Sequence, residues 1–294
     1  DLTGASGPEG FCVIDAETTP FPHARGRFTV LYLAQPENRV GICLAHSDDG
    51  LRWRGYPENP VISGWHDTQS VVFYDPRCRR YRLYMRPPVY ANRAAHANRK
   101  IALAESDDLV RWSIPRVVLD TDEADGPAFA EFAERPDLPP RGRVKQFYGL
   151  TAFPWEDGYV GLAWLYDVPP GRIAVELVHS PDGVVWRREP GRDAYLADGR
   201  PAGLAGTMVV TFASPPVPVG DELWFYVSAS LRIHHEKHSD DPRKHHRPYL
   251  LAVLRGRWVG YRAGEREGEL LTRALPPAER PTALNLRLGG GGEA

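Results

Sequence analysis

The sequence is poor in the features that mark metal, redox, membrane and nucleic-acid proteins. It has only three cysteines among 294 residues, and Cys12, Cys43 and Cys78 form no CxxC pair and no metal-like spacing. No apolar stretch approaches the roughly 20 residues of a membrane span. A net charge of −2 provides no basic field for nucleic acid or anionic lipid. We therefore expect structural thiols, no metal, no cofactor, no membrane partner and no nucleic-acid partner.

Helical periodicity is also scarce, whereas aromatic and turn-forming residues are abundant. The chain has 8 Trp, 13 Tyr and 10 Phe, together with 28 Gly and 28 Pro. Its hydrophobic content of 42% is enough to bury a sizeable core. Roughly 250 residues is a common size for one all-β domain. These features favour a single all-β unit.

A seven-residue pattern occurs three times, and each copy follows an apolar segment. The copies are Ser-Asp-Asp-Gly-Leu-Arg-Trp at 47–53, Ser-Asp-Asp-Leu-Val-Arg-Trp at 106–112 and Ser-Pro-Asp-Gly-Val-Val-Trp at 180–186. The pattern predicts a strand that ends in an Asp/Gly turn, followed by a strand that opens on Trp. Such recurrent hairpins are typical of propeller blades with inserted loops. We expect the three tryptophans to pack between strands.

Four blades can be placed along the chain, and they open near residues 11, 66, 146 and 206. Segments 1–8 and 262–288 could supply a fifth blade by pairing the two chain ends, which would remove exposed sheet edges. The prediction is an all-β, five-bladed β-propeller over 1–275. Residues 276–294 would form a tail or the start of a truncated segment.

The repeat, together with a blade opening of His66-Asp67-Thr68-Gln69 and the later Val72-Phe73-Tyr74-Asp75-Pro76, resembles a known superfamily. It is similar to the five-bladed propeller glycosidases that include glycoside hydrolase families 32, 43, 68 and 130, and to their uncharacterised bacterial members. The similarity covers about residues 9–275, and the strings at 146–154 and 220–226 contribute to it. It implies a glycoside hydrolase or transglycosylase acting in the axial funnel.

The resemblance also implies that carboxylates stand at the starts of the innermost strands. Glycoside cleavage needs a proton donor and a second carboxylate about 5 to 9.5 Å away. Asp67 matches the auxiliary Asp of the second blade, which orients the sugar or tunes the acid, and Glu9 is the candidate base of the first blade. Each has an alternative, because Asp67 could cap a turn and Glu9 could be solvated.

Five further residues would surround the sugar. We expect His66, Gln69, Arg86 and Tyr148 to hold sugar hydroxyls. Trp65 could stack on the sugar or pack in the core or a loop. The expected partner is a carbohydrate or a glycosylated small molecule.

The third and fourth blade openings depart from the family pattern, because 145–148 and 204–208 contain no Asp or Glu. A propeller that only binds a sugar or glycosylated small molecule, or that performs different chemistry in a biosynthetic pathway, is therefore the alternative function. The acidic loop 121–145 could bring an acid over the funnel or simply be solvated.

Five of the ten histidines crowd residues 234–246, where a metal, an anionic ligand or a solvated loop are the alternatives. The oligomeric state stays open. A cytoplasmic location is favoured, and secretion is possible if a signal peptide was removed.

Overall fold

The computed structural model describes residues 8–64, 66–67, 69–87, 99–126, 144–234, 236 and 240–258. The chain divides into a unit that ends at Arg255 and a second unit that begins at Gly256. Only the first three residues of the second unit are described. The predicted domain boundary at residue 275 and the tail 276–294 lie outside the described residues.

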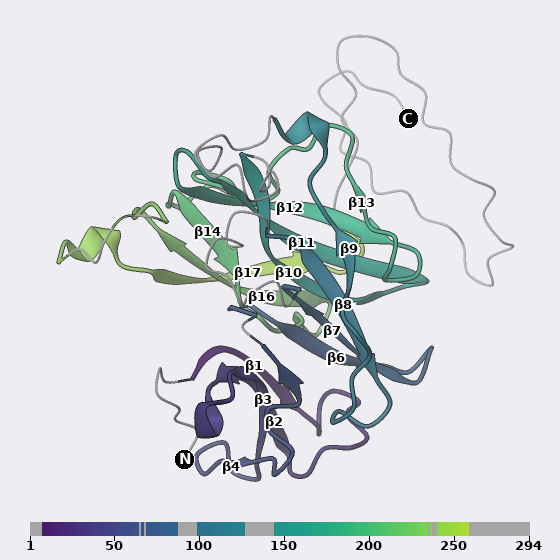
Figure 1. The fold of residues 1–294 in the computed structure, drawn as a ribbon. Helices are drawn as coiled ribbons and strands as arrows, with labels where there is room; N and C mark the ends of the chain where they lie inside the picture. Colours follow the sequence, from purple (N-terminus) through teal and green to yellow (C-terminus); the bar gives the residue numbers. More distant parts are fainter. Residues whose placement is uncertain are drawn as a thin grey trace, which may run out of the picture. The chain divides into compact units, whose positions relative to one another are not determined.

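Strands dominate the described chain, which confirms the all-β prediction (Figure 1). The helical elements found there are the three-residue 3-10 turns η1 (Pro36–Asn38), η3 (Glu123–Asp125) and η5 (Pro242–Lys244). None of the helices in this part of the chain has the length and apolar character needed to span a bilayer.

The first two sheets are antiparallel meanders. The first has the order β1-β2-β3-β4, with β5 paired to β3. Its strands are β1 (Glu9–Asp15), β2 (Phe28–Ala34), β3 (Gly41–Ser47), β4 (Arg54–Gly55) and β5 (Ile62–Ser63). The second has the order β6-β7-β8-β9, formed by β6 (Val71–Asp75), β7 (Arg80–Met85), β8 (Ile101–Ser106) and β9 (Arg116–Leu119).

The remaining strands form one eight-stranded sheet with two antiparallel halves. One half holds β10 (Lys145–Trp155), β11 (Gly158–Asp167), β12 (Arg172–Ser180) and β13 (Arg187–Arg188). The other holds β14 (Met208–Thr211), β15 (Val217–Val219), β16 (Glu222–Ser230) and β17 (Arg247–Leu254). A single parallel pair, Ile173 with Met208, joins them. The four antiparallel groups correspond to the four predicted units, whereas the segments predicted for a fifth fall, apart from Pro8, outside the described residues.

The first strands of successive groups are neighbours. β1 contacts β6, and β6 contacts β10. The Thr151 and Thr211 hydroxyls, 2.7 Å apart, link β10 to β14. This is the arrangement expected for sheets repeated around an axis. It brings the openings of these strands together although they are far apart in the sequence.

The three repeats form the predicted turns. In each copy one aspartate, Asp49, Asp108 or Asp182, accepts two backbone N–H groups at 2.8–3.0 Å. Trp53 and Trp112 donate their indole N–H to the turn carbonyls of Gly50 and Leu109. These acids and tryptophans therefore stabilise hairpins.

Candidate functional site

The loop before β6 holds Asp67 in an unusual backbone conformation. Asp67 has φ +55° and Gln69 has φ +76°, values in the left-handed region that cost a non-glycine residue about 1–3 kcal/mol. The Asp67 carboxylate pairs with the guanidinium of Arg86, which follows β7. The Asp67 side chain is 24% exposed, whereas that of Arg86 is 2% exposed. A buried cation thus holds an accessible carboxylate in place.

His66 supports this loop from the inside. Its ring is fully buried, and Nδ1 and Nε2 each lie 3.2 Å from a backbone carbonyl oxygen, those of Arg86 and Ser63. Burial lowers the pKa of His66, although the two carbonyls act in the opposite direction. Both nitrogens face carbonyls, so the structure places His66 as a support for Asp67.

Glu9 opens β1 beside an irregularity in that strand. The pairing register of β1 with β2 shifts between Glu9 and Cys12, and Gly10 adopts φ +68°. Burial raises the pKa of Glu9, and the negative charge of Asp67 raises it further. The two predicted carboxylates therefore interact electrostatically, Glu9 from the first sheet and Asp67 from the loop before β6.

Tyr148 sits at a bulge of β10. The register of β10 with β11 shifts between Phe147 and Gly149, which leaves Tyr148 without a cross-strand partner. Bulges often redirect a side chain next to an active site. Arg86 Nε donates to the Tyr148 carbonyl at 3.0 Å, and the Arg86 guanidinium carbon lies 4.1 Å from the centre of the Tyr148 ring.

A second arginine, Arg99, contacts the same ring. Its guanidinium carbon lies 5.3 Å from the centre of Tyr148, and its Nη1 donates to Gln146 Oε1 at 3.1 Å. Burial lowers the pKa of Arg99, and the nearby charge of Arg86 lowers it further. Two largely buried guanidinium groups therefore lie close together beside Asp67.

Aromatic rings complete the surroundings of Tyr148. Trp164 is stacked with it at 6.5 Å between centres, and Tyr166 meets it edge-on at 5.8 Å. His234, from the histidine-rich segment, places Nε2 3.0 Å from the Tyr148 hydroxyl. Gly149 allows a close approach here, because a Cβ there would lie 2.9 Å from Trp164 and 3.2 Å from Gln69 Cβ.

Most of the predicted site residues thus meet at the strand openings. Glu9 and Asp67 interact, Arg86 pairs with Asp67, and Gln69 and Tyr148 lie around the same bulge. Trp65 lies outside the described residues. The sequence did not indicate the other members of the cluster, which are Arg99, Gln146, Trp164, Tyr166 and the pairing of His234 with Tyr148.

The acidic loop contributes ion pairs to the scaffold. Asp122 pairs with Arg192 at 2.6 Å, and the buried Asp125 pairs with Arg188 at 2.5 Å. Its remaining acids beyond residue 126 lie outside the described residues. In the part of the chain that is described, no three His, Cys, Asp or Glu side chains gather closely enough to hold a metal ion.

The two buried cysteines have thiols of low reactivity. Cys12 and Cys43 are buried, and burial raises the pKa of each to about 11. A thiol with such a pKa stays protonated near neutral pH and is a poor nucleophile.

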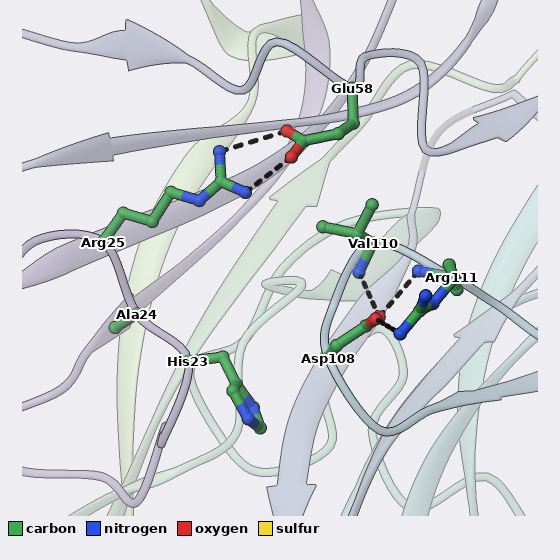
Figure 2. Close-up of a pocket in the computed structure, with 7 residues that line it drawn as sticks. All are labelled: His23, Ala24, Arg25, Glu58, Asp108, Val110 and Arg111. Carbon is green, nitrogen blue, oxygen red and sulfur yellow. Dashed lines mark hydrogen bonds and ion pairs between the residues drawn. The ribbon is translucent and has the colours of Figure 1, made fainter.

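A separate cavity of 490 Å³ lies between the loop after β1 and the second repeat turn. Figure 2 shows that its charged residues face partners of their own. Arg25 makes two hydrogen bonds to Glu58, at 2.7 and 3.1 Å, and Asp108 pairs with Arg111 at 2.8 Å. These pairs neutralise the lining, and Asp108 is the repeat-turn aspartate. The cavity belongs to the scaffold.

No protein-family profile matches the sequence, and no curated protein is similar to it. Solved structures do share the fold. β-1,2-Mannobiose phosphorylase from Listeria innocua is 18% identical with a TM-score of 0.52, over 77% of this chain and 56% of that protein. A thermostable family-43 glycoside hydrolase is 13% identical with a TM-score of 0.52, over 84% and 76% of the two chains. The chain thus matches little more than half the length of the phosphorylase.

These similarities confirm the predicted all-β propeller fold, which glycosidases share, whereas the predicted number of five blades stays a prediction. At such low sequence identity these similarities show the fold alone, and the chemistry has to be argued from the residues.

Proposed function

We propose that the protein is a glycoside hydrolase or transglycosylase whose site lies where β1, β6 and β10 open. The observation that carries the proposal is the ion pair between the buried Arg86 and the accessible carboxylate of Asp67 at the strand openings, and the Asp67 charge also raises the pKa of Glu9. The shared fold of propeller glycosidases and phosphorylases supports a carbohydrate as the substrate class.

The two carboxylates stand in opposite environments. The ion pair with Arg86 favours the ionised form of Asp67. Burial and the charge of Asp67 favour the protonated form of Glu9. Pairs of acids whose environments separate their pKa values commonly divide the roles of proton donor and ionised carboxylate. In this proposal Glu9, which the sequence suggested as the base, instead gives its proton to the leaving oxygen as the glycosidic C–O bond breaks, while the ionised Asp67 orients the sugar and favours the protonated form of Glu9. Water, or an acceptor hydroxyl in transglycosylation, then bonds to the anomeric carbon and returns a proton to Glu9.

The test is turnover of a panel of aryl glycosides by purified wild-type protein and four variants. We expect Glu9→Gln and Asp67→Asn each to lower kcat/KM by about 10²- to 10⁴-fold, the usual worth of positioned proton transfer. Glu17→Gln and Asp15→Asn are matched controls, because both side chains pair with Arg27 where β1 ends and β2 begins. Wild-type turnover that survives both site substitutions unchanged would rule out this mechanism.

A binding function is the second candidate, and one observation favours it. The described openings of β10 and β14 present Lys145, Gln146 and Thr207 where propeller glycosidases are expected to place further acids. Sugar binding that Asp67→Asn weakens, without turnover by the wild type on any aryl glycoside, would identify a binding propeller.

A further inference from the structure

Arg86 and Arg99 bring two positive charges close together, and the described residues around them supply less negative charge. Both guanidinium carbons lie within 5.3 Å of the centre of the Tyr148 ring. Arg86 is 2% exposed, and its charge disfavours the charged form of Arg99. Burying like charges together is costly unless an anion or hydrogen-bond acceptors compensate them.

Each arginine also keeps a buried donor without an acceptor among the described residues. Arg86 uses Nη1 for Asp67 and Nε for the Tyr148 carbonyl, while its Nη2 has no partner in the described part of the chain. Arg99 uses Nη1 for Gln146, while its Nε has no partner there. An unsatisfied buried donor is unfavourable, and more so on a charged group. These two donors are therefore available to a ligand.

The charge balance indicates what kind of ligand fits. Asp67 is the only carboxylate that pairs with either arginine among the described residues. If Glu9 is protonated, as the proposed proton donor must be, two guanidinium cations and one carboxylate leave one positive charge. A monoanion balances that charge, and a phosphate dianion exceeds it.

We propose that Arg86 and Arg99 bind the carboxylate of an acidic sugar, so that the substrate class is a uronic acid or its glycoside. This rests on the proposed function, because it places the sugar at the same strand openings. Nη2 of Arg86 and Nε of Arg99 both have N–H to donate, so the two arginines could bind one carboxylate together, and charge-assisted bonds of this kind are strong. Arg99 and Asp67 are partly exposed, so a sugar can reach the pair from their side.

The first experiment is titration calorimetry of the full chain with matched sugars. Glucuronate, galacturonate and mannuronate are compared with glucose, galactose and mannose, and glucose 6-phosphate and inorganic phosphate form separate arms. We expect at least one uronate to bind about 10- to 100-fold tighter than its neutral partner, since hydrogen bonds to charged groups contribute about 1.5–3 kcal/mol. Equal affinity, no uronate binding, or binding confined to a phosphate arm would overturn the proposal.

The second experiment assigns the preference to Arg99. We expect Arg99→Gln to reduce the ratio of uronate to neutral-sugar affinity about tenfold. Arg99→Lys should retain part of the preference, because lysine keeps the positive charge but lacks the planar guanidinium with its paired N–H donors. Arg25→Gln is the control, since Arg25 pairs with Glu58 in the separate cavity. Thermal melts check that each variant is folded, and an unchanged ratio in folded Arg99→Gln contradicts the assignment.

Calorimetry requires no turnover, so uronate binding can be found even if hydrolysis fails. Conversely, hydrolysis of neutral glycosides without any preference for uronides would support the enzyme and exclude the acidic substrate. The two proposals therefore fail separately.

Discussion

Glu9 and Asp67 show how two ordinary carboxylates acquire different tendencies to hold a proton. Glu9 is partly buried at the start of β1 and faces the negative charge of Asp67, so its pKa lies above the usual value. Asp67 has Arg86 as its counterion. The repulsion that raises the pKa of Glu9 therefore depends on the charge of Asp67, in the loop before β6.

This dependence gives a prediction for Glu9. Replacing Asp67 by Asn removes the repulsion, so the pKa of Glu9 should fall part of the way toward its ordinary value, while burial, the larger cause, should keep it raised. Carboxyl ¹³C NMR titration of wild type, Asp67→Asn and the control Asp15→Asn measures the shift directly. In the wild type, kcat/KM should decrease as pH rises through the pKa of Glu9, because the proton donor is then lost. An identical Glu9 titration in wild type and Asp67→Asn would contradict the coupling.

The sequence indicated some of these residues and not others for a physical reason. Asp67 and Arg86 could be found because they lie in a recognisable blade, before β6 and after β7. Arg99 precedes β8 in a segment without a motif, and its importance depends on Tyr148, 49 positions away, reaching the same place. His234 was visible only as one member of a histidine-rich run. Its partner is set by tertiary packing.

At the scale of elements, the three repeat turns use one backbone conformation with three different environments. The fourth position is Gly50 at φ +73°, Leu109 at φ +68° and Gly183 at φ +74°. The third turn contacts β7 of the second sheet: Arg82 Nη1 donates to the Asp182 carbonyl, and the Tyr84 hydroxyl donates to the Gly183 carbonyl. The third turn is therefore also a contact between sheets.

Glycine-to-alanine substitutions should separate the turn from the contact. Both Gly50→Ala and Gly183→Ala incur the left-handed penalty of about 1–2 kcal/mol. An added Cβ at Gly183 would lie 2.1 Å from Arg82 Nη1, whereas at Gly50 the nearest atom is 3.6 Å away. We expect Gly183→Ala to lower the free energy of unfolding by about 1–3 kcal/mol more than Gly50→Ala, measured by urea denaturation. Equal losses of unfolding free energy in the two variants would show that the contact between Gly183 and β7 does not stabilise the fold.

The turns were predictable because their signal is local, whereas the bulges were not. An Asp that accepts backbone N–H groups two and three residues ahead is a property of a short sequence. The register shift at Tyr148 lies where Trp164 on the next strand and Gln69 in the loop before β6 both come close to Gly149. A pattern of alternating residues does not reveal such a shift.

At the scale of the whole molecule, polar networks connect the sheets. Asp75, at the end of β6, is fully buried and accepts hydrogen bonds from Arg77 and from the Tyr159 hydroxyl on β11. Arg77 also reaches the Gly158 carbonyl at 3.0 Å. The Asp-Pro pair at 75–76 is a turn signal in the sequence, but the sequence does not show that the same carboxylate connects the second sheet to β11.

This connection should make stability depend on acid pH. Burial alone would raise the pKa of Asp75, but hydrogen bonds from Arg77 and Tyr159 outweigh it and lower the pKa below its ordinary value. A carboxyl with a lower pKa in the folded state stabilises the fold above its unfolded pKa, near 4, and loses that contribution as pH falls through the folded pKa. The loss should therefore begin below about pH 5 and continue as pH falls through the folded pKa of Asp75.

Asp75→Asn tests this at two pH values. At pH 7 the substitution should cost about 2–3 kcal/mol, less than the 3–5 kcal/mol for breaking a wholly buried pair because Arg77 is 37% exposed. At pH 3 the difference from wild type should shrink, since the wild-type carboxyl begins to protonate. Asp15→Asn is the matched control, because Asp15 ends β1 as Asp75 ends β6 but pairs with the more exposed Arg27 within its own sheet. Urea midpoints that fall equally for both variants, or a pH-independent cost of Asp75→Asn, would contradict a stabilising carboxylate between the sheets.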